Sequence, residues 1–114
     1  ELEGNEQLQR FIRLLADLNH ETVEMIRSGN MELLYAMNET IEEMYAIQSV
    51  GKEDAYTAID EDMQAIRMNF NAIVAMLQSN ETEVADFATN VAVKKFLHNI
   101  FDATVRIITA YGLA

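Results

Sequence analysis

"IRSGNMELL" (residues 26–34) lies between two segments that both favour helix. If one helix continued through it, the chain would be an extended rod, and if the chain turned there, it would be a bundle. Gly29 stands where a left-handed residue commonly ends a helix, and Asn30 can accept hydrogen bonds from the amides of a following first turn. The stretch therefore predicts the end of one helix and the start of another.

Apolar residues recur at alternating steps of three and four on both sides of this joint, and again further along the chain. Each series predicts a helix that lays a narrow apolar stripe on a neighbour. Two members of these series, Thr22 and Gln48, are polar but stand at the expected spacing. The three series are Leu8, Phe11, Leu15, Leu18, Thr22 and Met25; Leu34, Met37, Ile41, Met44 and Gln48; and Ile59, Met63, Ile66, Phe70, Ile73 and Leu77. Gly51 is expected to end the second helix, and Asp54 can cap the third.

The last helical region, about 81–111, has apolar residues on two different sides. Asn80 and Glu83 have the spacing of a capping box that would open it. From Val93 to Tyr111 the apolar residues span an arc of about 180°, whereas those at 84–91 centre on nearly the opposite side. We therefore predict a bend or break near residues 90–95, or a long helix whose two halves pack against different surfaces.

The predicted fold is all-α, an antiparallel up-down-up-down four-helix bundle. Short connections at 28–30, 49–54 and 78–80 place successive helices antiparallel. Residues 1–114 are expected to form one helical-bundle domain, which can also be part of a longer chain because it begins with Glu1. The alternative, one long coiled coil through Gly29 and Gly51, is disfavoured by the loop and capping signals.

Charge and composition narrow the classes of partner. The net charge of −11 opposes the phosphate neutralisation that drives nucleic-acid binding, so no nucleic-acid partner is expected. Residues 28–66 hold nine acids and one base, so an electrostatic partner of that part should be basic. No apolar run reaches the ~18 residues of a membrane span, so no membrane partner is expected. The absence of cysteine fits a reducing compartment, and we expect a cytoplasmic protein.

Acidic and histidine side chains gather at two places without forming a recognisable catalytic or metal site. Four of them share one side of the first helix, but they fall on outward positions, which favours a solvated face. These are Asp17, His20, Glu21 and Glu24. His98 and Asp102, one turn apart, are interpreted as a surface pair because no Ser or Cys nucleophile accompanies them. We therefore expect no enzyme, no metal and no cofactor.

Surplus apolar surface is the feature that points to a partner. Val23, Tyr35 and Met68 lie off the helix seams, and the C-terminal apolar face is wider than the ~100° stripe that one neighbour covers. Flexible methionine side chains adapt to varied apolar helices. The candidate partner-binding residues are Phe96, Ile100, Phe101, Ile108, Tyr111, Met68 and Tyr35.

Residues 26–47, IRSGNMELLYAMNETIEEMYAI, resemble the small all-helical flagellar export chaperones. That family shows a Ser-Gly-Asp/Asn-x-x-x-Leu step between amphipathic helices and a later N…N…L helix, which RMNFNAIVAML at 67–77 matches. The matching positions are Ser28, Gly29, Asn30, Leu34, Asn69, Asn71 and Leu77. The match covers about half of the chain, which lacks the long polar linker that the family has before its last helix. The resemblance implies a cytoplasmic chaperone that holds the apolar helical end of a secreted subunit.

Two functional hypotheses from different classes follow. The first is a non-enzymatic protein-binding module of chaperone or adaptor type, which holds an apolar amphipathic helix of a partner protein. The alternative is a structural or oligomerisation domain of a larger protein, in which the same apolar face forms a homodimer.

Overall fold

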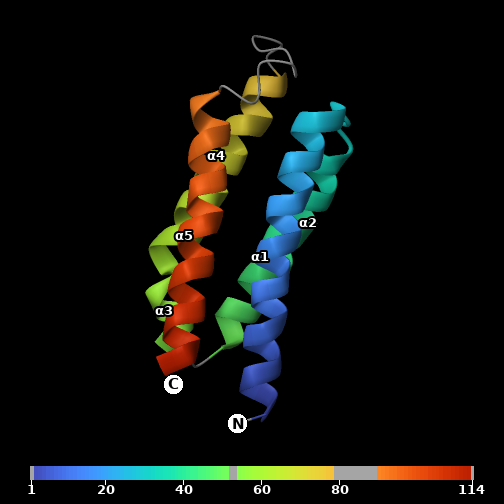
Figure 1. Ribbon diagram of the computed structural model, residues 1–114. Helices are drawn as coiled ribbons and strands as arrows, with labels where there is room; N and C mark the ends of the chain where they lie inside the picture. The colour runs from blue at the N-terminus through green and yellow to red at the C-terminus, as the bar shows by residue number, and fades with distance from the viewer. Residues whose placement is uncertain (1, 52–53, 79–89, 114) are drawn as a thin grey trace.

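The computed structural model describes residues 2–51, 54–78 and 90–113, with side chains from residue 6 to residue 110 within these ranges. This part of the chain holds helices α1 (Leu2–Ser28), α2 (Leu33–Val50), α3 (Asp54–Ala58), α4 (Asp60–Gln78) and α5 (Val91–Leu113). The molecule is elongated, with extents of 47 × 21 × 20 Å (Figure 1).

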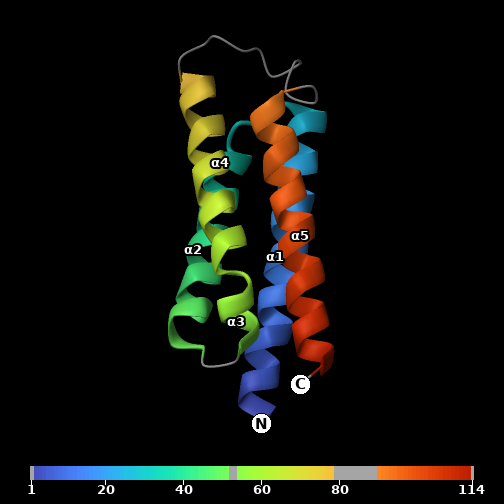
Figure 2. The same ribbon diagram turned by 90° about the vertical axis from the view of Figure 1, so that its left-hand side faces the viewer.

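The four long helices pack side by side as an antiparallel bundle. Helix α1 packs against α2 and α5, and α4 packs against α5, so three edges of the bundle are well filled. The fourth edge, between α2 and α4, is the most sparsely packed of the four. Figure 2 shows α4 and α5 side by side, with α1 behind α5. The predicted all-α up-down-up-down bundle is confirmed, and the alternative of a rod through Gly29 is wrong.

The turn between α1 and α2 forms as the sequence predicts. Gly29 has a φ of 72°, in the left-handed region, and its amide donates to the carbonyl of Met25 at 2.9 Å. Asn30 Oδ1 then accepts from the amide of Glu32 at 3.0 Å, and the amide of Asn30 donates to Ser28 Oγ at 3.2 Å. Side chains thus satisfy backbone groups on both sides of the turn, which fixes how α2 leaves α1.

The three predicted series of residues form most of the core. Nearly all their members are buried, and Leu34, Gln48 and Leu77 at the ends of the series are half-buried. Thr22 is fully buried, and its hydroxyl donates to the carbonyl of Leu18 at 2.7 Å. A polar residue can therefore stand in the seam because its own helix satisfies its hydrogen bond.

The third helix differs from expectation, because the chain breaks at Ile59 into the short α3 and the long α4. The carbonyl of Ile59 accepts from the amide of Met63 at 2.9 Å and so opens α4. Helix α3 places Tyr56 in the core, with its ring edge-on to Phe11 and the centroids 5.7 Å apart. Gln48 Nε2 donates to the carbonyl of Tyr56 at 3.1 Å. A side chain of α2 thus satisfies a carbonyl at the end of α3, where the helix is interrupted.

Helix α5 begins at Val91, within the range predicted for a bend or break. The side-chain oxygen of Asn90 accepts from the amide of Ala92 at 2.8 Å, which caps the new helix. From there α5 continues without interruption to Leu113. The predicted capping box of Asn80 and Glu83, and the apolar positions at 84–88, lie outside the described residues.

Candidate partner-binding site

Polar side chains cross-link α2 to α4 along the end of their shared edge that lies next to α3. Gln48 Nε2 lies 3.3 Å from Asp60 Oδ1, in addition to its bond to the backbone of α3. One turn further along, the hydroxyl of Tyr45 donates to the carbonyl of Met63 at 2.9 Å. Burial raises the pKa of this hydroxyl, with Asp60 and Glu42 adding to the shift and Arg67 opposing it. The hydroxyl therefore keeps its proton for the bond over the whole neutral range.

Arg67 is the last of these cross-links. Its Nη1 donates to Asn38 Oδ1 at 3.0 Å, and its Nη2 lies 3.2 Å from Glu42 Oε1. The guanidinium also lies over the rings of Tyr45 and Phe70, at 5.8 and 5.9 Å from their centroids. Arg67 thus bridges the two helices and closes the polar part of the edge.

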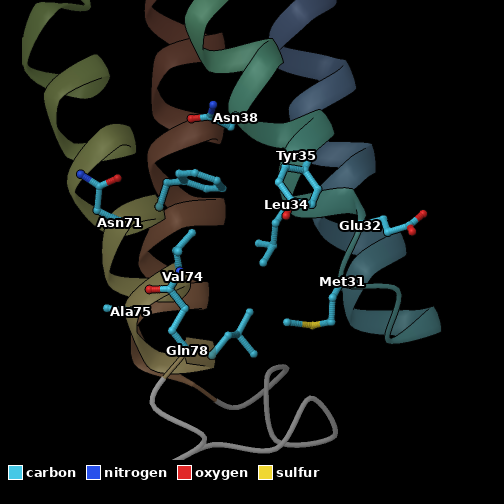
Figure 3. A pocket seen from close by; sticks show the side chains of 11 residues that line it. Met31, Glu32, Leu34, Tyr35, Asn38, Asn71, Val74, Ala75 and Gln78 are labelled. Atoms are coloured by element: carbon cyan, nitrogen blue, oxygen red, sulfur yellow. The ribbon is translucent and has the colours of Figure 1, made fainter.

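Beyond Arg67 the two helices are separated by an apolar groove of about 700 Å³ (Figure 3). Phe70 is buried at its floor, and Leu34, Val74 and Leu77 are half-buried in its walls. Tyr35 and Met31 stand at the rim of α2, with 76% and 36% of their surface exposed. The full lining is Met31, Glu32, Leu34, Tyr35, Asn38, Phe70, Asn71, Val74, Ala75, Leu77 and Gln78.

The side of the groove that α2 forms is acidic. Glu32 is the charged residue of the lining, Glu42 lies beside Arg67 at the closed end of the groove, and α2 contains no basic residue. Arg67, the nearest cation of α4, is engaged by Glu42 and Asn38. A ligand of the groove therefore meets apolar walls beside a negative rim.

The structure separates the candidate residues named from the sequence. Tyr35 lines the groove, whereas Met68, which is 72% exposed, lies on α4 outside its lining. Phe101 and Ile108 are exposed on α5, at 63% and 48%. The side chain of Tyr111 lies outside the described residues.

Phe96 and Ile100 are core residues, so their assignment to a partner-binding surface has to be corrected for this conformation. Phe96 is fully buried and Ile100 is 2% exposed. The ring of Phe96 packs against that of Phe70, with the centroids 6.0 Å apart. The wide apolar arc of α5 is therefore only partly buried, because α1 and α4 cover one side of it and leave the other exposed.

Most of the groove was not foreseen from the sequence. Leu34, Phe70 and Leu77 belong to the predicted seams, so they were expected to be covered by a neighbouring helix. One residue could have indicated the groove from the sequence. Val74 is apolar but lies outside the seam that contains Phe70 and Leu77. A second apolar line on α4 indicates surface that the neighbouring helix does not fully cover.

In each of the two groups of acidic and histidine residues, some side chains form pairwise contacts with neighbouring side chains. Glu21 accepts from the hydroxyl of Thr40 at 2.9 Å, and Glu24 forms two contacts with Arg27, at 2.6 and 3.1 Å. His98 Nε2 lies 3.4 Å from Asp102 Oδ2 on the surface of α5. Within residues 2–51, 54–78 and 90–113, no three or more such side chains are placed to hold a metal ion.

Asp62 is a buried carboxylate between α4 and α5. Its side chain is 8% exposed, and its Oδ2 lies 3.4 Å from Nε of Arg106. Burial raises the pKa of Asp62, Arg106 lowers it, and Asp102 and Glu61 raise it further. Because the net shift is upward, burial outweighs the attraction of Arg106, and the fold favours the neutral carboxyl.

Replacing Asp62 by Asn should therefore flatten the pH dependence of stability. A carboxyl with a higher pKa in the folded chain lowers stability at neutral pH, and stability rises as the pH falls through the raised pKa. Urea unfolding between pH 7 and about pH 4 should show a smaller gain for Asp62→Asn than for the unchanged protein. Glu61→Gln is the matched control, because it removes an equal charge from an exposed neighbour. If both variants gave the same pH dependence, general charge repulsion rather than burial of Asp62 would be responsible.

No helix in the described part of the chain is both long enough and apolar enough to cross a membrane. No family model, curated protein or solved structure matches the chain.

Proposed function

We propose that this protein is a non-enzymatic helix-binding module of chaperone or adaptor type, which holds an amphipathic helix of a partner protein between α2 and α4. The observation that carries the proposal is the apolar groove that stays open where the cross-links between these helices end. Grooves of this kind take the apolar face of a helix, and each Å² of apolar surface removed from water contributes about 25 cal/mol before ordering costs.

The charge of the rim selects the polar face of the partner helix. Glu32 lies in the lining of the groove, and the whole chain carries −11. A partner with lysine or arginine beside its apolar stripe gains from this field, and a partner with acidic residues is repelled. The expected ligand is therefore a basic amphipathic helix.

The resemblance to flagellar export chaperones supports the same proposal. Of its matching positions, Leu34, Asn71 and Leu77 line the groove, although they come from two separate segments of the motif. Gly29 and Asn30 form the turn that precedes Met31 at the rim. On this resemblance the partner would be the apolar helical end of a secreted subunit, and the protein would act in the cytoplasm.

Peptide binding tests the proposal. A labelled Leu/Lys amphipathic peptide of about 18 residues, long enough to form a helix, should bind in a fluorescence anisotropy titration, and its Leu/Glu counterpart should not. Val74→Asp should weaken binding at least tenfold, because it places a carboxylate in the apolar wall. Tyr35→Ala should also weaken peptide binding. Because Tyr35 is exposed, this substitution should leave the core intact.

Two comparisons separate groove binding from attraction to an acidic protein. Val74→Asp makes the chain more acidic, so non-specific attraction of a basic peptide would increase while groove binding falls. Met68→Ala is the matched control for Tyr35→Ala, since both remove an exposed side chain and only Tyr35 lines the groove. Unchanged binding in Val74→Asp and Tyr35→Ala, with helical content intact by circular dichroism, would disprove the proposal.

A further inference from the structure

Five nitrogen-bearing side chains line a hollow of about 400 Å³ between α4 and α5. They are Asn69 of α4 and Lys94, Lys95, His98 and Asn99 of α5. Among the residues that the structure describes, no carboxylate lines this hollow, although the chain has 19 acidic residues and a net charge of −11. The hollow is therefore a local concentration of positive charge on an acidic protein.

The residues that α5 contributes form two pairs, each one helical turn apart. Lys94 is followed four positions later by His98, and Lys95 by Asn99, so these side chains occupy neighbouring positions on the helix surface. From α4, Asn69 Nδ2 donates to Asn99 Oδ1 at 2.7 Å. Because Asn99 accepts through its oxygen, its amide nitrogen can donate to a ligand.

The two lysines differ from most of the arginines, whose charges the protein itself neutralises. Four arginines lie within 3.4 Å of a carboxylate, namely Arg10, Arg27, Arg67 and Arg106. Within residues 2–51, 54–78 and 90–113, neither Lys94 nor Lys95 forms an ion pair. Both also lie close to the amino-terminal end of α5, where the helix carries a partial positive charge of its own. An anion bound here would relieve the repulsion between these charges.

We propose that this hollow binds an oxyanion of the phosphate class, held by the ammonium groups of Lys94 and Lys95 and the amide of Asn99. Two ammonium groups balance the charge of a phosphate monoester, which is close to −2 at neutral pH. Its three terminal oxygens can accept from three separate donors, whereas a carboxylate has only two oxygens. The acid of α5, Asp102, lies outside the lining and 3.4 Å from His98 Nε2.

This anion site is separate from the groove proposed to bind a helix. The groove lies between α2 and α4, the hollow lies between α4 and α5, and no described residue belongs to both linings. The proposal therefore does not depend on peptide binding, and either site can be tested while the other is empty.

Amide NMR titrations at constant ionic strength test the site. Inorganic phosphate and glycerol phosphate should each shift the signals of Asn69 and residues 94–99, with saturation in the millimolar range. The signals of Leu34 and Val74 in the groove should not move. Sodium acetate is the control for a singly charged anion, and it should bind more weakly or not at all.

Charge-matched variants separate the hollow from general attraction to cations. Lys94→Gln combined with Lys95→Gln should weaken phosphate binding roughly tenfold, because it removes both ammonium groups. Arg10→Gln combined with Arg13→Gln removes the same charge from α1, so it should leave phosphate binding nearly unchanged. Equal weakening by the two double variants, shifts that do not saturate, or acetate binding as tight as that of phosphate would overturn the proposal.

A short phosphoserine peptide identifies the source of the phosphate group. If it binds more tightly than glycerol phosphate, and its unphosphorylated form does not bind, the site recognises a phosphorylated partner protein. If glycerol phosphate binds as tightly or more tightly, the site takes a small free phosphate ester. Both results require the same lysines, so loss of binding in Lys94→Gln with Lys95→Gln is expected for either ligand.

Discussion

Phe96→Ala is expected to lower the free energy of unfolding by about 3–5 kcal/mol, whereas Phe101→Ala, five residues later, should change it by less than about 0.5 kcal/mol. Phe96 is fully buried where α4 packs on α5, and its ring contacts that of Phe70. Truncation removes the contact and leaves a cavity that the two packed helices cannot easily close. Phe101 is 63% exposed, so its truncation removes little buried area.

Urea unfolding followed by circular dichroism measures both changes. The protein should be kept at low micromolar concentration, so that pairing between copies does not add to the stability of the unchanged chain. A loss of about 3–5 kcal/mol would be a large fraction of the roughly 5–15 kcal/mol typical of a domain, so partial unfolding at room temperature is also a consistent result. Equal effects at the two positions would mean that α5 is rotated about its axis, so that Phe96 and Phe101 are equally buried.

Gly51→Ala is expected to cost roughly 2–3 kcal/mol, although the backbone there can take any residue. Gly51 has a φ of −71° and a ψ of 141°, an ordinary extended conformation. The cost comes from the added Cβ, which would meet the ring of Tyr56 and lie 2.9 Å from its Cζ. Tyr56 cannot easily move aside, because it is 3% exposed and packs edge-on against Phe11.

A double-mutant cycle identifies the cause. If the clash with the ring is responsible, Gly51→Ala should cost much less in a Tyr56→Leu background than in the unchanged protein, as measured by urea unfolding. The Tyr56→Leu single variant supplies the reference for the lost ring. An equal cost in both backgrounds would place the effect in the connection itself rather than in the contact with α3.

The helices and most of the core could be predicted because one periodicity describes each helix and one neighbour covers each seam. Even Thr22, which is polar, lies in the core, since its register rather than its polarity sets where it points. The turn at Gly29 and Asn30 was predictable because its geometry depends on local residues alone. The break at Ile59 was not, because Ala55, Tyr56 and Ile59 continue the buried face of α4. Nothing in their spacing distinguishes a straight helix from a broken one.

The candidate site was harder to predict because it depends on distances between helices. Tyr35 could be recognised as surplus apolar surface, but the opposite wall with Val74 appears only when α2 and α4 are placed side by side. For α5, periodicity gives a wide apolar arc without saying which part its neighbours cover. The error at Phe96 and Ile100 has this origin.

The place of Arg67 limits how much of a partner the groove can hold. From Phe70 to Gln78, α4 rises only ~12 Å, or a little more than two helical turns. On one side the guanidinium of Arg67 spans to Asn38 and Glu42 and blocks further extension. A helix seated here therefore cannot extend towards α3 past Arg67, and from Phe70 to Gln78 the groove offers it about two helical turns of apolar wall. The Arg67 bridge thus sets the register of a bound helix at that end of the groove.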